Sequence, residues 1–431
     1  MNYHRRFKDA TKPIPLNLCF LIIALLCTSF FNQSHAANLQ DALGSARSNN
    51  RNIKLELIKL KSTKVLKTEA ISEFLPDISA NAQYGNRNSS YKDQTTDAST
   101  KQRVQEIRLE QPLFDGFRSV SKFREAKYKI KSAKSQTRDK IQEISFAAVQ
   151  SYCNLFRYSK FAELQKENQE FGDRFLKLVQ KRKDVQIIDK SEIIKFTYEA
   201  AINDEKYLNS LNELSKAKFD YQNIVGRLDE NLSQPIITKE KFDHGKVLDS
   251  ALASNNIIKS SHYEYLASKA SYNAEKSNFS PTISLSASAS KEEQVVYLNN
   301  QDLNNRTVFI NISVPIFQKG TEYASLSRAK YEKQAAREQY EISREEIIKE
   351  VNQTLEEYRF YSQMNQSNKK LWDMAKDRMA IFNKRLKSRI EDPIEVIRAR
   401  IEANDRQINY INSQMDLVIS YYKIKYFLGE I

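Results

Sequence analysis

The sequence predicts a mainly α-helical, elongated chain with a small β part, and three observations predict this class. The 431 residues include only 8 glycines and 8 prolines, and 28% of the residues are charged, a composition that favours long helices. Four short segments alternate between apolar and polar residues, as strands with two different faces do. The second half of the chain repeats landmarks of the first, which indicates an internal duplication.

Residues 1–36 are expected to form a signal peptide. A basic start precedes an apolar stretch at 16–31, and the small residues at 34–36 suit a cleavage site. An uncleaved N-terminal anchor is the alternative. Lipid attachment at Cys27 is not expected, because the residues just before it are not small.

The duplication is carried by three ordered matches separated by 203 to 206 residues. The matching segments are "SNN" at 48–50 and 254–256, "LPDIS" at 75–79 with "SPTIS" at 280–284, and "QPLFDGFRSVSKFREAKY" at 111–128 with "VPIFQKGTEYASLSRAKY" at 314–331. The sequence therefore predicts a first repeat at 37–230, a link at 231–245 and a second repeat at 246–431.

Each repeat is expected to contain a helix, two strands joined by a polar loop, a very long helix and a shorter helix. In the first repeat the helices are expected at 38–74, 118–183 and 190–226, with strands at 76–86 and 103–114. In the second repeat the helices are expected at 246–279, 320–388 and 394–428, with strands at 281–291 and 306–317. A heptad pattern over the last helix, with Asn404 on its seam, predicts coiled-coil packing.

The strands show the pattern of membrane-crossing strands. In 281–291 the apolar positions alternate with serine and threonine, and the other strands alternate in a similar way. Apolar and polar residues alternate in this manner over about ten residues in barrel strands that span a membrane. The aromatic residues Tyr84, Phe114, Tyr297 and Phe317 fit interfacial girdles near the strand ends. Soluble hairpins packed on the helices are the alternative.

Four strands are too few to form a closed barrel. A sheet in lipid must close, because its edges would otherwise leave unpaired backbone groups. Known outer-membrane barrels have at least about 8 strands, so two copies of the chain are needed for 8 and three for 12. The serine-rich face favours the wider, water-filled barrel. We therefore expect an obligate homo-oligomer, with three copies favoured.

The segments "FLPDISANAQY", "QPLFDGFRS" and "VPIFQKGTEYASLSRAK", together with the duplication and the long helices, resemble the TolC-type outer-membrane channel proteins. The resemblance covers about residues 38–428. It implies a homotrimer with a shared 12-stranded barrel in the outer-membrane lipid and a helical barrel that crosses the periplasm.

The same resemblance implies a transport function. Such trimers dock through a periplasmic adaptor, also called a membrane fusion protein, with an inner-membrane transporter. They form the exit duct of efflux pumps and type I secretion systems. The sequence itself names neither the cargo nor the partner pump.

The resemblance also implies a gate at the periplasmic turns 181–192 and 387–398. The candidate gate residues are the charged side chains of these turns, namely Asp189, Glu192, Glu391, Asp392, Glu395 and Arg398. Members of the family often carry two acids after the second turn and glycines in the turns, whereas this chain has Arg398 in place of the second acid and lacks the glycines. Glu395 either supplies a ring of three carboxylates that favours cations, or it is a first-turn acid that pairs with Arg398 or with the helix N-terminus.

Other function classes fit less well. Beyond the signal peptide the chain has two histidines, one cysteine and no metal-spaced or phosphate-loop motif, so neither an enzyme nor a cofactor is expected. Its basic residues alternate with acids on helix faces, which argues against nucleic-acid binding. The remaining rival is a soluble periplasmic coiled-coil scaffold or adaptor.

Overall fold

The computed structural model describes residues 38–89, 98–184, 189–229, 231–237, 240–296, 299–388 and 390–431. The predicted signal peptide, including Cys27, and the predicted girdle residue Tyr297 lie outside these residues.

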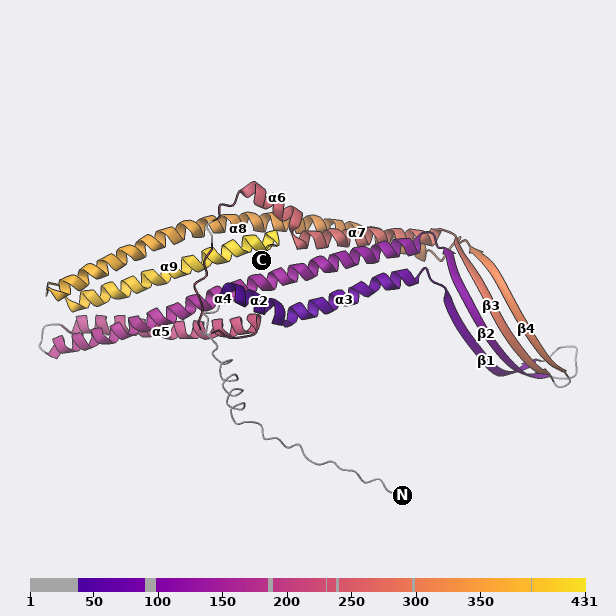
Figure 1. The fold of residues 1–431 in the computed structure, drawn as a ribbon, viewed down its shortest axis with the longest axis horizontal. Coiled ribbons are helices and arrows are strands. Elements are labelled where there is room, and N and C mark those ends of the chain that lie inside the picture. Colours follow the sequence, from indigo (N-terminus) through magenta and orange to yellow (C-terminus); the bar gives the residue numbers. More distant parts are fainter. Residues whose placement is uncertain are drawn as a thin grey trace, which may run out of the picture.

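The chain forms a long helical body with one small sheet at one end (Figure 1), so the predicted class, mainly α with a small β part, is confirmed. The elements are α2 (Leu39–Asn49), α3 (Arg51–Ser72), β1 (Asp77–Ser89), β2 (Ala98–Phe114), α4 (Arg118–Asp184), α5 (Lys190–Val225), α6 (His244–Ser254), α7 (Asn256–Lys276), a 3-10 turn (Ser277–Phe279), β3 (Thr282–Val296), β4 (Asn299–Ser313), α8 (Thr321–Lys387) and α9 (Pro393–Leu428). Within the described part of the chain, none of the helices is both long and apolar enough to cross a membrane.

The two halves of the chain have the same order of elements. The long helices α4 and α8 both have 67 residues, and α5 and α9 both have 36. At 1.5 Å per residue each long helix extends about 100 Å. Sparse glycine and proline allow such lengths, because neither residue interrupts the backbone hydrogen bonds.

The predicted single helices at 38–74 and 246–279 are wrong, because each is divided by an asparagine. Asn50 leaves the helical conformation and its side chain accepts a hydrogen bond from the backbone N–H of Asn52 at 2.9 Å. Asn255 accepts one from Ile257 in the same way, also at 2.9 Å. Asparagine is a favoured N-cap because its carbonyl satisfies a free N–H at a helix start. The repeated "SNN" therefore marks a break in both repeats.

The helices lie in an open row. In the half of the body far from the sheet the order is α5-α4-α9-α8, and in the half near the sheet it is α3-α4-α7-α8 (Figure 1). Exposed apolar side chains occur on the edge helices, with Tyr198 and Phe219 on α5 and Phe360 and Met374 on α8 all more than half exposed. Both edges of the row therefore expose apolar surface to solvent in the single chain.

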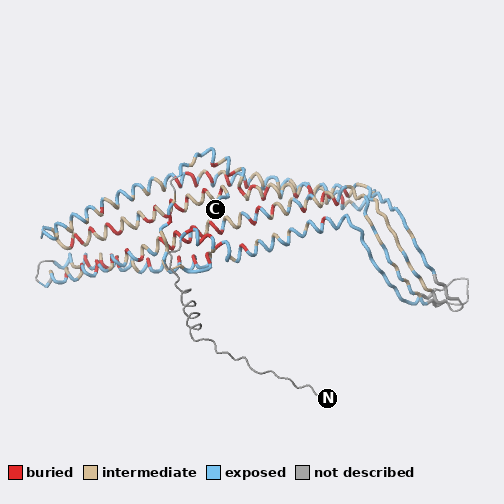
Figure 2. Tube along the Cα trace, viewed as in Figure 1, coloured by how far each residue is buried: buried red, intermediate tan, exposed pale blue. Residues whose placement is uncertain are grey.

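Two buried cores hold the middle of the body (Figure 2). One lies where α2, α4, α5 and α9 meet, and its fully buried side chains include Tyr152, Tyr221 and Met415. The other joins α6 and α7 to α8 and α9 around Leu355 and Phe427. The first core contains residues of both repeats and so fixes the repeats against each other, whereas the buried residues of the second core all belong to the second repeat.

The sheet has the order β1-β2-β3-β4, and all neighbouring strands are antiparallel. Its register aligns Ile78, Leu109, Ala287 and Val308 in one row across the four strands. Similar rows above and below this one give the sheet an apolar face. Among the described residues the face is not covered by helices, and Val308 is 70% exposed. The alternative of hairpins packed on the helices is therefore wrong.

The opposite face of the sheet is polar. The next row aligns Ser79, Arg108, Ser288 and Thr307, and the hydroxyls of Ser288 and Thr307 lie 2.8 Å apart. Strands β1 and β4 are the edges of this sheet and pair on one side only. The single chain therefore presents a two-faced sheet with two open edges.

The strands are displaced from the predicted boundaries. Strand β2 begins five residues earlier than expected, and β4 runs from Asn299 to Ser313. Pro315 and Phe317 therefore lie beyond the strand, in the connection to α8. Backbone pairing needs no apolar side chains, so the polar loop residues extend the strands, whereas Pro315 has no N–H to continue the ladder.

Each strand-to-helix connection contains two consecutive residues with positive φ. In the first repeat these are Gly116 (φ 69°) and Phe117 (φ 66°), and in the second they are Lys319 (φ 58°) and Gly320 (φ 79°). The glycine occupies the first position of one pair and the second position of the other. One glycine in each pair limits the cost of a left-handed backbone.

The first prediction compares the two glycines. A Cβ on Gly116 would lie 2.5 Å from Cβ of Ser280, whereas nothing lies within 4 Å of a Cβ on Gly320. Both Gly116→Ala and Gly320→Ala should lose about 1–2 kcal/mol from the left-handed conformation, and Gly116→Ala should lose more because of the clash. Denaturant unfolding followed by circular dichroism measures the difference. Equal losses would show that the contact with Ser280 relaxes freely.

Candidate functional site

The predicted gate residues gather at the end of the body opposite the sheet. There α4 ends, α5 begins, α8 ends and α9 begins (Figure 1). Asp189 is the N-cap of α5 and accepts hydrogen bonds from the backbone N–H groups of Ser191 at 2.7 Å and Glu192 at 2.9 Å. Hydrogen bonds from the Ser191 hydroxyl and from these N–H groups lower the pKa of Asp189. Its role in the single chain is to start a helix.

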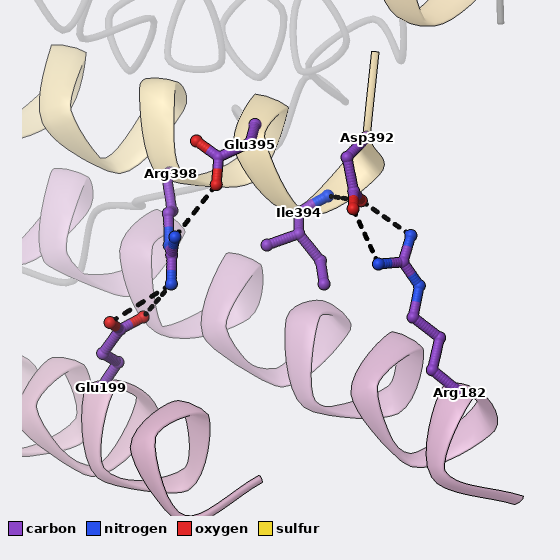
Figure 3. Close-up of polar contacts among 6 residues, drawn as sticks. All are labelled: Arg182, Glu199, Asp392, Ile394, Glu395 and Arg398. Carbon is purple, nitrogen blue, oxygen red and sulfur yellow. Dashed lines mark hydrogen bonds and ion pairs between the residues drawn. The ribbon is translucent and has the colours of Figure 1, made fainter. Parts of the chain in front are cut away.

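Asp392 joins the two repeats (Figure 3). It is the N-cap of α9 and accepts a hydrogen bond from the Ile394 N–H at 2.9 Å. Its two carboxylate oxygens each accept a hydrogen bond from Arg182, near the end of α4, at 2.7 Å. Such a two-point contact between a guanidinium and a carboxylate has defined geometry as well as charge attraction. One carboxylate therefore begins α9 and holds it to α4.

The contact with Arg182 perturbs the protonation of both groups. The hydrogen bonds from Arg182 are the main reason why the pKa of Asp392 lies below its ordinary value of 3.8, and the same contact raises the pKa of Arg182. The folded carboxylate holds its charge more firmly than the unfolded one, so the contact stabilises the tip above pH 3.8 and this stabilisation fades as the pH falls lower.

Arg398 forms the second connection between the repeats (Figure 3). It donates to Glu395, one turn earlier on α9, at 3.0 Å, and to both carboxylate oxygens of Glu199 on α5 at 3.3 and 3.4 Å. Its guanidinium also lies 5.3 Å from the ring centroid of Phe196. In the single chain Glu395 is therefore paired with Arg398, as the second of the two readings of Glu395 expects.

A small apolar cluster lies beneath these charges. Phe175 on α4 and Phe196 on α5 meet edge to face with centroids 4.9 Å apart. Val179 and Ile394 complete the buried cluster. Ile193 and Ile397 pack against it, so a small apolar cluster and the ionic contacts together join α9 to α4 and α5 here.

The other predicted residues are less involved. Glu391 pairs with Arg385 of α8 at 3.5 Å, which stays within the second repeat. Among the described residues, no hydrogen bond or ion pair links Asp189 or Glu192 to α9. The structure thus brings Asp392, Glu395 and Arg398 into contacts near one another, and leaves Asp189 and Glu192 at their own helix start.

Sequence reasoning missed Arg182 and Glu199. Arg182 lies inside the basic run at 181–183, where nothing distinguishes it from its neighbours. Glu199 lies three residues after Phe196 and so shares its side of α5, which is the only signal that could have selected it. Both residues depend on partners about 200 positions away, which the sequence pattern does not identify.

Further polar contacts between the repeats lie behind the tip. The amide of Asn404 on α9 donates to Asn168 on α4 at 2.9 Å, and Asp405 accepts from Asn168 and from Lys206 of α5, both at 3.2 Å. A cavity of about 520 Å³ lies beside them, with Glu199 and Arg398 in its wall. In the described ranges no cluster of histidine, cysteine and acidic residues is suited to a metal ion. The site consists of ionic and polar contacts between repeats.

The chain matches the family described as outer membrane efflux protein over residues 42–185 and 247–430. It is 23% identical to the outer membrane efflux protein BepC of Brucella suis over 252 residues. This match covers 57% of this chain and 54% of BepC. It is 28% identical to the solvent efflux pump outer membrane protein SrpC of Pseudomonas putida over 173 residues. This match covers 40% of this chain and 37% of SrpC. The chain thus spans about half the length of BepC and less of SrpC.

Solved structures share the fold. A membrane protein from Pseudomonas aeruginosa matches with a TM-score of 0.79 and 16% identity over 91% of both chains. The CmeC outer membrane channel of Campylobacter jejuni matches with a TM-score of 0.79 and 15% identity, over 93% of this chain and 87% of CmeC. The outer membrane protein VceC of Vibrio cholerae matches with a TM-score of 0.76 and 16% identity, over 91% and 96% of the two chains.

The second prediction separates the two roles of Asp392. Asp392→Asn should keep the cap, because asparagine caps as well as aspartate, but lose the ionic contact, and Arg182→Gln should cause a similar loss. Asp392→Ala should lose about 1 kcal/mol more. Hydrogen exchange of the first amides of α9 measures the local opening free energy. If the first amides of α9 have the same opening free energy in the Asp392→Asn and Asp392→Ala variants, the capping role assigned to Asp392 is wrong.

Proposed function

Since the chain belongs to the outer membrane efflux protein family, we propose that it is the outer-membrane channel of a tripartite efflux pump. In this proposal its sheet lies in the outer membrane and its helical body extends through the periplasm. Identical copies enclose a passive water-filled duct, through which substrates supplied by an inner-membrane transporter leave the cell.

The two-faced sheet with open edges carries this proposal. Its apolar rows are exposed to more than half of their area at Ile78, Val308 and Ile310, which in water would be a liability for aggregation. In a barrel the same rows face lipid and the serine-rich rows face water. A soluble scaffold has no use for such a sheet, so the rival reading is not supported.

An assembly of three copies best accounts for the pairing of the open strand edges. Four strands per chain give 12 strands, above the minimum of about 8 and wide enough for a lumen. The edges β1 and β4 are different surfaces, so β4 of one copy pairs with β1 of the next and the ring closes head to tail. The helix row closes in the same sense, because its edges α5 and α8 also belong to different repeats.

The partners follow from the family rather than from the geometry of this chain. An adaptor protein and an inner-membrane transporter are expected at the tip end, and the transporter must supply the energy because a duct performs no chemistry. The matched relatives are named as efflux proteins, so we favour small-molecule efflux over protein secretion. Secretion of a protein by cells that carry this channel would reverse that choice.

We assign the gate to the contacts between repeats at the tips. Arg182 with Asp392 and Arg398 with Glu199 hold α9 against α4 and α5, so releasing them lets the tip of α8 and α9 move away from that of α4 and α5. The pairing of Glu395 with Arg398 at 3.0 Å favours a gate held closed by ion pairs over a ring of unpaired carboxylates. Asp189, Glu192 and Glu391 border the opening in this proposal.

The third prediction tests the function. The detergent-purified chain should be a trimer by native mass spectrometry and should conduct ions in a planar bilayer. Val308→Lys places a charge on the lipid-facing side at a cost of up to about 2–4 kcal/mol per copy and should reduce assembly. Thr307→Lys makes a comparable change one residue away, on the water-facing side, and should assemble normally.

Two results would contradict the proposal. One is a monomer that is released from cells without detergent and conducts no current in any state. The other is equal tolerance of Val308→Lys and Thr307→Lys, because then neither face would be in contact with lipid.

The fourth prediction tests the gate. The double variant Arg182→Gln, Arg398→Gln removes the two ionic contacts assigned to the gate and should raise single-channel conductance severalfold. Arg378→Gln is the matched control, since its 2.6 Å contact with Glu402 joins α8 to α9 within the second repeat, and its conductance should stay near that of the unmodified channel. A double variant that conducts like the control would remove these contacts from the gate.

A further inference from the structure

The distal part of the sheet carries opposite charges on its two faces. On the face with the apolar rows, the register at and beyond the level of Arg306 places four basic residues, Lys101, Arg103, Lys291 and Arg306, and two acidic residues, Glu293 and Asp302. On the opposite face the same levels carry Glu106 and Glu292. Basic residues thus outnumber acidic residues on the side that the proposed function turns toward lipid.

The register gives the height of these cations in the membrane. Rows on one face are two residues apart, which is about 6.8 Å along a strand. From Ile312 to Arg306 there are three such steps, and with a strand tilt of about 40° they rise about 15 Å through an apolar band about 25 Å tall. Lys291 lies one row higher and Arg103 two rows higher, beside the exposed ring of Tyr84 at 5.7 Å. The cluster therefore reaches the distal headgroup layer.

Glu293 contacts two of these cations, Lys291 at 2.6 Å and Arg103 at 3.5 Å. For Arg306 no ion pair is found among the described residues. Positive charge in excess at this level attracts anionic headgroups, and an arginine can extend its side chain to reach them.

A hollow lies between the same rows. Its volume is about 890 Å³, and its lining includes Ala80, Ala82 and Ala289 together with Lys291 and Arg306. The row between these levels, with Asn81, Glu106, Ser290 and Asn305, completes the floor of the hollow. Small residues leave space against the backbone, and the two cations lie at its border. The hollow has room for one acyl chain of a lipid, and the phosphate group of the same lipid would contact the cations.

We propose that this face binds the phosphate groups of an anionic outer-leaflet glycolipid, with Arg306, Lys291 and Arg103 as the phosphate contacts and the alanine-lined hollow as the acyl-chain contact. The proposal rests on the proposed function, because it requires this face to lie in the outer membrane. A bound lipid of this kind would seal the outer surface of each sheet and fix its height in the membrane.

The fifth prediction uses diphosphorylated lipid A and phosphatidylcholine as probes of the purified trimer. Native mass spectrometry should show retention of lipid A and little retention of phosphatidylcholine. Arg306→Gln should weaken lipid A binding about fivefold, in line with the usual effect of one cation near an anionic surface, and Lys291→Gln combined with it should weaken binding further. Arg306→Lys should retain most of the affinity.

Arg108→Gln is the matched control. Arg108 lies on β2 in the row next to that of Arg306, but on the opposite face, so its loss should leave lipid A binding unchanged. Equal weakening by Arg306→Gln and Arg108→Gln, or equal retention of the two lipids, would overturn the lipid site. If the trimer conducts in that same preparation, the proposed function stands, whereas a chain that neither assembles nor conducts overturns both proposals.

Discussion

The constraint on which the rest of the structure depends is that one chain supplies a sheet and a helix row that both end in open edges. Strands β1 and β4 each pair on one side only, and every unpaired backbone group in lipid costs several kcal/mol. The helix row also has open edges, since apolar side chains such as Phe219 and Phe360 on its edge helices are more than half exposed. Both sets of open edges are covered when identical copies meet edge to edge.

The duplication makes such closure possible with one kind of interface. Because the first repeat supplies β1 and α5 and the second supplies β4 and α8, the two edges of the chain are different surfaces, and the closure proposed for them is a head-to-tail ring. The packing at the strand-to-helix connections also depends on the duplication. There Gly116 of the first repeat lies against Ser277 and Ser280, which lead into β3. Close contact between repeats at this point keeps β2 beside β3, so that the two hairpins form one sheet.

The sequence predicts the elements well because their signals are local. Helix lengths follow from the scarcity of glycine and proline, and the strands follow from period-two alternation. The breaks at Asn50 and Asn255 escape this reasoning, because a capping asparagine inside an apolar-periodic helix looks like an ordinary polar residue. The tip contacts escape it for a different reason. Arg182 meets Asp392, and Glu199 meets Arg398, only because two long helices and their turns end at the same level, which is a property of the whole fold.

Cohesion between the repeats is unevenly distributed along the body, and this distribution suits a gate. In the middle, a large apolar core with fully buried side chains such as Tyr152, Tyr221 and Met415 joins the repeats, and each such side chain contributes about 1.5–3 kcal/mol. At the tip, four buried apolar residues and two partly exposed ion pairs do so, and an ion pair of that kind contributes about 1 kcal/mol or less. In the proposed gate, a partner that offers competing contacts to Arg182 or Arg398 replaces the ion pairs, and separating the tips also exposes the small apolar cluster. The middle stays closed in this proposal, because its apolar core is larger than the cluster at the tip.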